Sequence, residues 1–185
     1  MKKRIIQILI LILVLILLIR IISLTISKYK SSATSDPAIQ VAFYVLNRDY
    51  QTMNLKLDSL FPREEPYTYY FSISNSNGEK TCETDMEYDL SIRTTTNLPI
   101  EYELYKNDKY TNATAQNIIK TNDIIQDDDG TYFRTITTDT ETFSYKEAKK
   151  NTYQLVVKFP EKYNTINYQD IIEAIEITVD SKQII

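Results

Sequence analysis

The residue types that carry most enzyme chemistry are scarce in this chain of 185 residues, which has no histidine, no tryptophan and one cysteine. Without histidine the chain has no HExxH zinc site, no Ser-His-Asp relay and no Cys-His pair. Carboxylates alone can hydrolyse glycosides, but the spacing of the 25 Asp and Glu residues singles out no acid and nucleophile. The composition therefore argues against an enzyme, and it names no catalytic residue, cofactor or metal ligand.

One acidic run, Asp127 to Asp129 followed by Gly130, has the residue types of a calcium loop. Its spacing does not fit, because placing Gly130 at the sixth loop position puts Ile125 first and Ile136 last, where Asp and Glu should be. Asp and Gly are also what a tight turn requires. We therefore interpret the run as the turn of a hairpin, and cation binding by Asp127–Asp129 stays open.

The lone Cys82 excludes an intrachain disulfide. It could link two copies or take a lipid, but nothing near it would lower the pKa of its thiol much, and it lies far from the apolar segment behind which a lipoprotein cysteine would stand. We interpret Cys82 as a small neutral residue of a strand.

The 15 tyrosines raise the question of a carbohydrate-binding face. Four of them fall on the apolar side of their predicted strands and are expected in the core; they are Tyr69, Tyr88, Tyr102 and Tyr153. The run Tyr67–Tyr70 is the best candidate for an exposed aromatic edge. Asn112-Ala113-Thr114 fits an N-glycosylation sequon, a pattern short enough to arise by chance.

The amino-terminal segment is the clearest element of the sequence. Lys2, Lys3 and Arg4 precede a run without polar residues from Ile8 to Ile19. As a helix, residues 5–26 would extend roughly 33 Å, enough to cross a bilayer core of about 30 Å. Arg20 shortens the apolar run to the length of a secretory signal, and a cleavage site at Ser31–Ala33 is available. Residues 1–27 are thus a signal peptide or a signal-anchor helix, and either one exports the rest of the chain.

Charge separates this segment from the remainder of the chain. Residues 1–30 hold six of the 21 Lys and Arg residues and no acidic residue, so the remainder carries 15 basic against 25 acidic side chains, a formal charge of −10. Such a body is a poor partner for nucleic acid. Residues 28–38 are predicted to be a polar stalk, and residues 39–185 one extracellular domain, of a size that can bury its own core.

Alternating apolar and polar residues predict a mainly β domain. We expect residues 39–45 to form a strand inside a sandwich, because both of its faces are fairly apolar. We expect 67–74 to pair with 86–93 across a turn at Asn75–Gly78, and 124–126 to form a hairpin with 131–136. Further strands are expected at 100–105, 152–159 and 174–183. Residues 145–151 and 168–172 are expected to be helical, and 112–122 a short helix or a loop. About eight strands favour an antiparallel β-sandwich or jelly-roll-like domain preceded by one hydrophobic helix.

Two stretches near the ends of the chain are distinctive, Lys28–Thr34 leading to Ile39–Ala42 and Thr152–Pro160 leading to Tyr168–Gln183. They resemble exported proteins of Gram-positive bacteria similar to TasA and camelysin. It implies a jelly-roll-like domain, export by a signal peptide and a role in surface or biofilm-matrix fibres. In such fibres the segment after the signal completes the sheet of the next subunit, a role that would fall on Ile39–Val45 or on the stalk before it. The metalloprotease activity attributed to camelysin-like members is not transferred, because no histidine is present to hold a metal.

These observations lead to an expected function. The chain is expected to be a non-enzymatic cell-surface or secreted structural protein, with self-assembly or other surface proteins as its partners and the membrane as partner of its N-terminal helix. The alternative is a membrane-tethered module that binds a glycan or a protein through tyrosine-bearing loops. An envelope hydrolase that uses only carboxylates is a third class.

Overall fold

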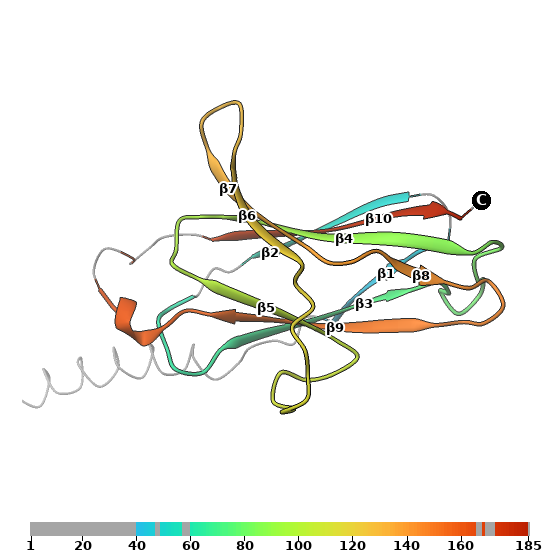
Figure 1. The fold of residues 1–185 in the computed structure, drawn as a ribbon, viewed down its shortest axis with the longest axis horizontal. Coiled ribbons are helices and arrows are strands. Elements are labelled where there is room, and N and C mark those ends of the chain that lie inside the picture. The colour runs from blue at the N-terminus through green and yellow to red at the C-terminus, as the bar shows by residue number, and fades with distance from the viewer. Residues whose placement is uncertain (1–39, 47–48, 57–59, 166–167, 169–172, 185) are drawn as a thin grey trace, which may run out of the picture. The chain divides into compact units, whose positions relative to one another are not determined.

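The computed structural model describes residues 40–46, 49–56, 60–165, 168 and 173–184. Over these residues the backbone forms two β-sheets and a short 3-10 helix, η1 (Glu161–Tyr163) (Figure 1). They belong to a compact unit that comprises residues 38–185. The helix predicted for 1–27, the stalk predicted for 28–38 and all but Tyr168 of the helical turn predicted for 168–172 lie outside the described residues.

The first sheet has four strands in the order β1-β3-β9-β5. Its strands are β1 (Gln40–Tyr44), β3 (Tyr67–Ser74), β9 (Lys150–Lys158) and β5 (Glu101–Lys106). β9 is antiparallel to both of its neighbours, whereas β1 runs parallel to β3. The predicted antiparallel arrangement therefore holds for this sheet except at β1.

The second sheet has six strands, all antiparallel, in the order β2-β10-β4-β7-β6, and β8 pairs with β4 next to the segment that pairs with β7. Its strands are β2 (Asp49–Lys56), β10 (Ala174–Gln183), β4 (Met86–Thr95), β7 (Tyr132–Thr137), β6 (Thr121–Gln126) and β8 (Glu141–Phe143). The predicted mainly β, two-sheet architecture is thus present.

Alternation along the strands builds the core between the sheets. In β4 the side chains of Met86, Tyr88, Leu90 and Ile92 are buried, and the residues between them are exposed or half-buried, as predicted. Ile175, Ile177 and Val179 of β10 lie inward in the same way. The first sheet contributes the opposite wall of one continuous hydrophobic cluster, with Phe71, Ile73, Leu104, Tyr153 and Leu155 among its members.

The prediction that the strand at 67–74 pairs with the one at 86–93 is wrong. β3 lies in the first sheet and β4 in the second, so residues 75–85 cross from one sheet to the other. The two strands therefore face each other across the core and do not pair edge to edge. Asn75 is fully buried on this crossing, and its Nδ2 donates to the carbonyls of Ser144 and Glu147, each at 2.9 Å.

The helix predicted for 145–151 is also wrong, because residues 145–147 form a turn and β9 already begins at Lys150. The run of Lys, Glu and Ala favours a helix locally, but tertiary contacts override that preference. The backbone N–H of Lys149 donates to Asn75 Oδ1 at 2.7 Å, which fixes this loop on the crossing segment.

Other differences concern strands with weak patterns. β2 and β8 were not predicted. Residues 112–120 form the loop that was one of the two expected alternatives, and residues 121 and 122 already belong to β6. β1 is not buried on both faces as expected, because Ala42 and Tyr44 are exposed, and it pairs only with β3 among the described strands. The strands predicted at 67–74, 100–105, 152–159 and 174–183 are present within a residue or two of the expected bounds, β9 beginning two residues early. The hairpin around Gly130 is also present, and its first strand, β6, begins three residues earlier than expected.

Candidate functional site

Strand addition requires an edge that another chain can reach, and the β1 edge of the first sheet is one. β1 pairs in parallel with β3, with Gln40 opposite Tyr70 and Tyr44 opposite Ser74. No strand of the described residues pairs with the other side of β1. Backbone N–H and C=O groups on that side are where a further strand would bind.

Two side chains hold β1 in place by filling the core. Phe43 is 3% exposed and Val45 is fully buried. The Phe43 ring lies 6.1 Å from the Phe71 ring in an edge-to-face arrangement, and the Phe71 ring in turn stacks on Tyr153 with 5.0 Å between centroids. The backbone N–H of Val45 continues the ladder by donating to the Ser74 carbonyl at 2.8 Å. β1 is therefore a short strand with one deep apolar anchor, Phe43, and a second, Val45, directly after it.

The outward side of β1 is covered at one residue by a side chain. Gln51 Nε2 donates to the Tyr44 carbonyl at 2.7 Å, and the Tyr44 N–H donates to Gln51 Oε1 at 3.3 Å. The Gln51 amide thus pairs with Tyr44 as the backbone of a neighbouring strand would. Because orientation alternates along a strand, Ala42 turns its backbone groups to the same side as Tyr44.

The opposite edge of the first sheet, at β5, is covered by the loop that follows it. The Leu104 N–H donates to Asn117 Oδ1 at 3.0 Å, and the Leu104 carbonyl accepts from the Ile118 N–H at 2.9 Å. These bonds saturate the backbone of Leu104, in the middle of the strand. Each edge of this sheet is thus capped at one residue, Tyr44 at β1 and Leu104 at β5.

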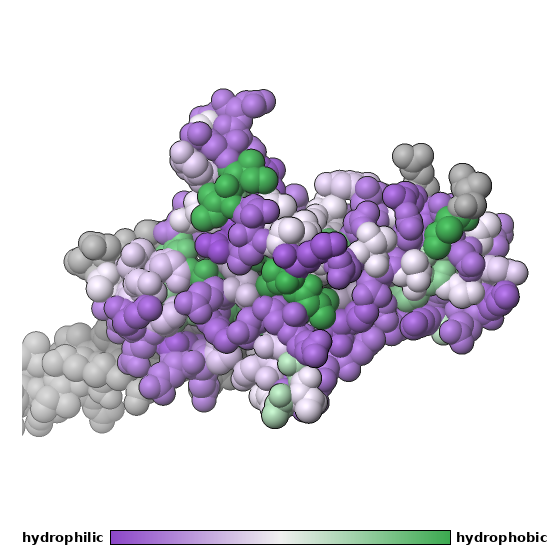
Figure 2. All heavy atoms as spheres, in the orientation of Figure 1, coloured by the Kyte–Doolittle hydropathy of each residue, from purple (hydrophilic) through white to green (hydrophobic). Residues whose placement is uncertain are grey.

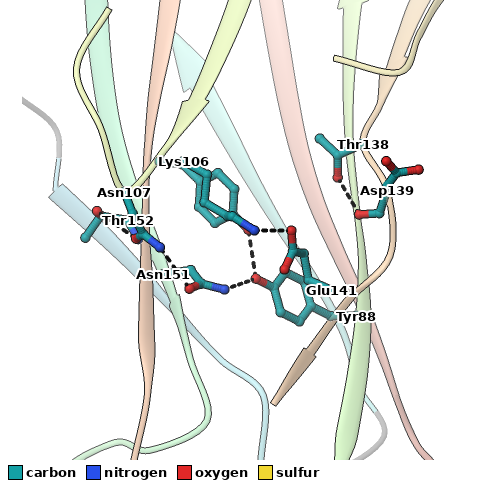
Figure 3. A network of polar contacts seen from close by, with 9 residues as sticks. Tyr88, Lys106, Asn107, Thr138, Asp139, Glu141, Asn151 and Thr152 are labelled. Carbon is teal, nitrogen blue, oxygen red and sulfur yellow. Dashed lines mark hydrogen bonds and ion pairs between the residues drawn. The ribbon is translucent and has the colours of Figure 1, made fainter. Parts of the chain in front are cut away.

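A polar network inside the sandwich is the other candidate site (Figure 3). Its centre is the Tyr88 hydroxyl of β4, which lies 2.7 Å from the Tyr153 hydroxyl of β9 and accepts from Asn151 Nδ2 at 2.7 Å. At its margin Lys106 of β5 forms an ion pair with Glu141 of β8. The network therefore joins β4 and β8 of the second sheet to β9 and β5 of the first.

The electrostatics of this network favour structure over chemistry. Burial raises the pKa of Tyr88 to about 12, and burial followed by the proximity of Tyr88 raises the pKa of Tyr153 further. Both groups therefore stay neutral phenols at physiological pH. A phenol held in this form donates and accepts hydrogen bonds but does not act as a base.

Glu173 is a buried carboxyl group just before β10, with 1% of its surface exposed. Its Oε2 accepts from the Leu98 N–H at 3.3 Å, and its Oε1 accepts from the Tyr102 hydroxyl at 3.4 Å. Burial raises the pKa of Glu173 to about 7, against these hydrogen bonds, which lower it. The sequence carried no signal for this site, because an isolated Glu beside a strand is usually exposed.

The acidic run forms a hairpin turn, as predicted. The Asp127 N–H donates to the Thr131 carbonyl at 2.8 Å, and Gly130 has φ of 87°. Asp127 forms an ion pair with Arg93, and Asp129 Oδ1 accepts from the Thr131 N–H at 2.9 Å, which lowers the pKa of Asp129. Among the described residues no group of three or more His, Cys, Asp or Glu side chains is arranged to hold a metal ion.

Of the two predictions about tyrosines, one is confirmed and one is wrong. The four expected in the core, Tyr69, Tyr88, Tyr102 and Tyr153, are buried. The exposed aromatic edge predicted for Tyr67–Tyr70 is wrong, because Tyr67 and Tyr69 both face the core and only Tyr70 and Thr68 are half-buried. Among the described residues four other tyrosines are exposed; they are Tyr44, Tyr50, Tyr132 and Tyr145. Alternation along a strand could have placed the first three, whereas Tyr145 lies in a turn.

Two further predicted residues are described. Cys82 is 4% exposed and accepts a weak hydrogen bond from Asn75 Nδ2 at 3.5 Å, which fits the interpretation as a small neutral residue, although it lies in a loop. Asn112 of the sequon is exposed, and its Nδ2 donates to Asp108 Oδ1 at 3.0 Å.

No helix in the described part of the chain has the length and apolar character needed to span a membrane. Comparison with known proteins identifies no relative: no protein-family model matches the sequence, and no curated protein is significantly similar to it.

Proposed function

We propose that this chain is a non-enzymatic structural protein of the cell surface or the extracellular matrix, and that its copies assemble by exchange of β1. In this assembly β1 of one copy occupies the place beside β3 of the next copy. The observation that carries the proposal is that β1 pairs with one strand only among the described residues, yet Phe43 and the adjacent Val45 fill the core. A slot with these properties accepts the same segment from another copy as readily as from its own.

The position of β1 in the chain supports this assignment. It is the first described strand, and 39 residues precede it. The connection to β2 is short, so exchange moves one small element and leaves the remainder of both sheets intact. The resemblance of both ends of the chain to TasA-like matrix proteins, with their jelly-roll-like domains, is consistent with strand exchange between subunits.

The apolar segment of residues 1–27 fixes where we expect the assembly. Retained, it is a membrane anchor with the β domain outside the cell; cleaved near Ser31–Ala33, it releases a secreted subunit. The amino-terminal residue of the mature protein in its native host distinguishes the two. A protein recovered with Met1 intact from the soluble cytosol would contradict both.

Cysteine pairs chosen from the β1–β3 register test the exchange. Ala42 lies opposite Ser72, a spacing that a disulfide can close. We co-express two full-length variants, Ala42→Cys and Ser72→Cys, and expect a disulfide-linked heterodimer on a non-reducing gel. A pair of Ala42→Cys with Thr68→Cys is the control, because residue 68 is four positions out of register.

The two possible results are distinct. Exchange links Ala42→Cys to Ser72→Cys between chains, and electron microscopy of the same material is expected to show filaments. A third chain carries both Ala42→Cys and Ser72→Cys. If this chain forms only an internal disulfide, and the mixed single variants form no heterodimer, β1 remains in its own subunit and the proposal is wrong.

A further inference from the structure

The hairpin of β6 and β7 ends in a turn that projects beyond the other strands of the second sheet (Figure 1). All residues of β6 after Thr121 are exposed, and the side chains of Ile124 and Ile125 are 54% and 53% exposed. Figure 2 shows a hydrophobic patch on this hairpin within a hydrophilic surface. β6 is the last strand of its sheet, and no strand of the described residues pairs with its outer side. An apolar, extended edge of this kind is one that natural proteins usually cover.

Backbone orientation shows which residues of β6 face outward. The Asp127 N–H points to Thr131 of the partner strand, and β6 and β7 are in continuous register from Thr121 opposite Thr137 to Gln126 opposite Tyr132. Because orientation alternates in an antiparallel strand, three residues direct their N–H and C=O groups to the open side. These residues are Asn122, Ile124 and Gln126.

We propose that β6 pairs with β6 of a second copy, antiparallel, about a two-fold axis at Ile124. In this register Ile124 faces Ile124 of the other copy, and Asn122 faces Gln126 on each side of the axis. All three outward residues then meet an outward residue, so the pairing is self-complementary. A shift of two residues in either direction leaves one of the three without a strand residue opposite it.

Charge distribution supports a second copy as the occupant. The antiparallel register brings Lys120, at the base of one hairpin, to the Asp127–Asp129 turn of the other, and this occurs twice by symmetry. Lys120 is 61% exposed in its side chain and already contacts Asp139, but an ammonium group has three donors and can take a second carboxylate. Asp123 lies directly opposite Ile125 of the other copy, so no directly opposed pair in this register has like charges.

The pairing is independent of the proposed exchange of β1. In the second sheet β6 and β2 lie at opposite edges, and β2 follows β1 directly in the chain. A copy can therefore exchange β1 with one neighbour and pair β6 with another. Together the two contacts would link strand-exchanged copies laterally, and each can fail without the other.

Disulfide trapping tests both the contact and its register. In the full-length chain, Ile124→Cys places two thiols opposite each other at a hydrogen-bonded pair, where the Cα separation of about 5.5 Å suits a disulfide. Ile125→Cys is the matched control, because it is equally exposed but faces Asp123 of the other copy. We expect a covalent dimer from Ile124→Cys, none beyond wild type from Ile125→Cys, and a heterodimer from Asp123→Cys mixed with Ile125→Cys.

The proposal is overturned if Ile124→Cys and Ile125→Cys cross-link equally, or if neither exceeds the wild-type chain, which contains only the buried Cys82. Sedimentation of lysine variants gives a second measurement. Ile124→Lys puts two like charges on the axis and is expected to weaken association by about tenfold or more, whereas Ile125→Lys faces Asp123 and is expected not to weaken it. Equal weakening by both variants contradicts this register.

Discussion

The Tyr88 hydroxyl of β4 lies 2.7 Å from the Tyr153 hydroxyl of β9, so the two sheets are hydrogen-bonded to each other within their shared core. Asn151 donates to the same Tyr88 oxygen. The contact is polar, yet the tyrosine rings around it belong to the hydrophobic cluster, since Tyr153 stacks on Phe71 and Tyr88 stacks on Phe143. Satisfied polar groups in such a place fix one relative position of the sheets.

Removing the Tyr88 hydroxyl should therefore lower the free energy of unfolding. Tyr88→Phe leaves Asn151 Nδ2 and the Tyr153 hydroxyl without their buried partner, and an unsatisfied buried group costs about 1–3 kcal/mol. We expect denaturant unfolding to show a loss of this size. Tyr145→Phe is the control, because Tyr145 is 48% exposed and its substitution should change stability by less than about 0.5 kcal/mol. Equal effects of both variants would mean that the Tyr88 hydroxyl does not join the sheets energetically.

Glu173 should make the stability of the domain depend on pH. Its pKa is raised from an ordinary 4.5 to about 7 in the folded state. Below pH 4.5 the carboxyl is protonated in both states and imposes no penalty. Between pH 4.5 and 7 the unfolded state loses its proton first, so the stability falls, and above pH 7 the loss is complete. We expect the free energy of unfolding to drop by roughly 1–3 kcal/mol between pH 5 and 8.

The absence of histidine makes this measurement specific, because no other side-chain type ordinarily titrates in that window. The Gln side chain of the Glu173→Gln variant cannot ionise. We therefore expect the melting temperature of this variant to stay constant between pH 5 and 8, even if it differs from that of the wild type. Glu176→Gln, in a half-buried position on β10, should keep the wild-type slope. A slope that survives Glu173→Gln would assign the pH dependence to another group.

The strands that could be predicted from the sequence are those with one buried face and one solvent-exposed face. β4 and β10 are ten residues long each, and their apolar residues recur at every second position. Sequence alone therefore placed alternate residues on the core side, which are Met86, Tyr88, Leu90 and Ile92 of β4 and Ile175, Ile177 and Val179 of β10. β2 was missed because Tyr50, Thr52 and Asn54 alternate with Gln51, Met53 and Leu55, which gives little contrast between the two sides. β8 has three residues, too few for any period to show.

The candidate sites were less predictable, because they depend on pairing between distant segments. The sequence of β1 alone does not indicate that this strand runs parallel to β3 at an edge of its sheet. It also does not indicate that the Gln51 side chain hydrogen-bonds the backbone of Tyr44. The turn at Asn75–Gly78 looked like a hairpin because its residue types are those of a hairpin. The eleven residues between β3 and β4 instead change sheets, and only the pairing of β3 with β9 reveals it.

Gln51 should control access to the β1 edge. Gln51→Ala removes the amide that pairs with both backbone groups of Tyr44, so the Tyr44 N–H should exchange with solvent deuterium faster. Gln116→Ala, in an exposed loop position, should leave that exchange unchanged. If assembly by β1 exchange occurs, Gln51→Ala should also raise the yield of the Ala42→Cys and Ser72→Cys heterodimer. An unchanged Tyr44 exchange rate would mean that the side chain does not protect this edge in solution.

Gly130 should determine whether the β6–β7 hairpin holds its register. Its φ of 87° is a conformation that side chains other than Asn and Asp rarely adopt, and a Cβ there would lie 3.7 Å from Gln126 Nε2, an ordinary contact. The cost of Gly130→Ala therefore comes from the backbone, about 1 kcal/mol, and Gly130→Asn should recover part of it. The Asp127 N–H donates to Thr131, and we expect it to exchange with solvent several-fold faster in the Gly130→Ala variant. We also expect the yield of the Ile124→Cys dimer to be highest with Gly130, lower with Gly130→Asn and lowest with Gly130→Ala. Identical exchange rates in all three proteins would contradict a left-handed turn at Gly130.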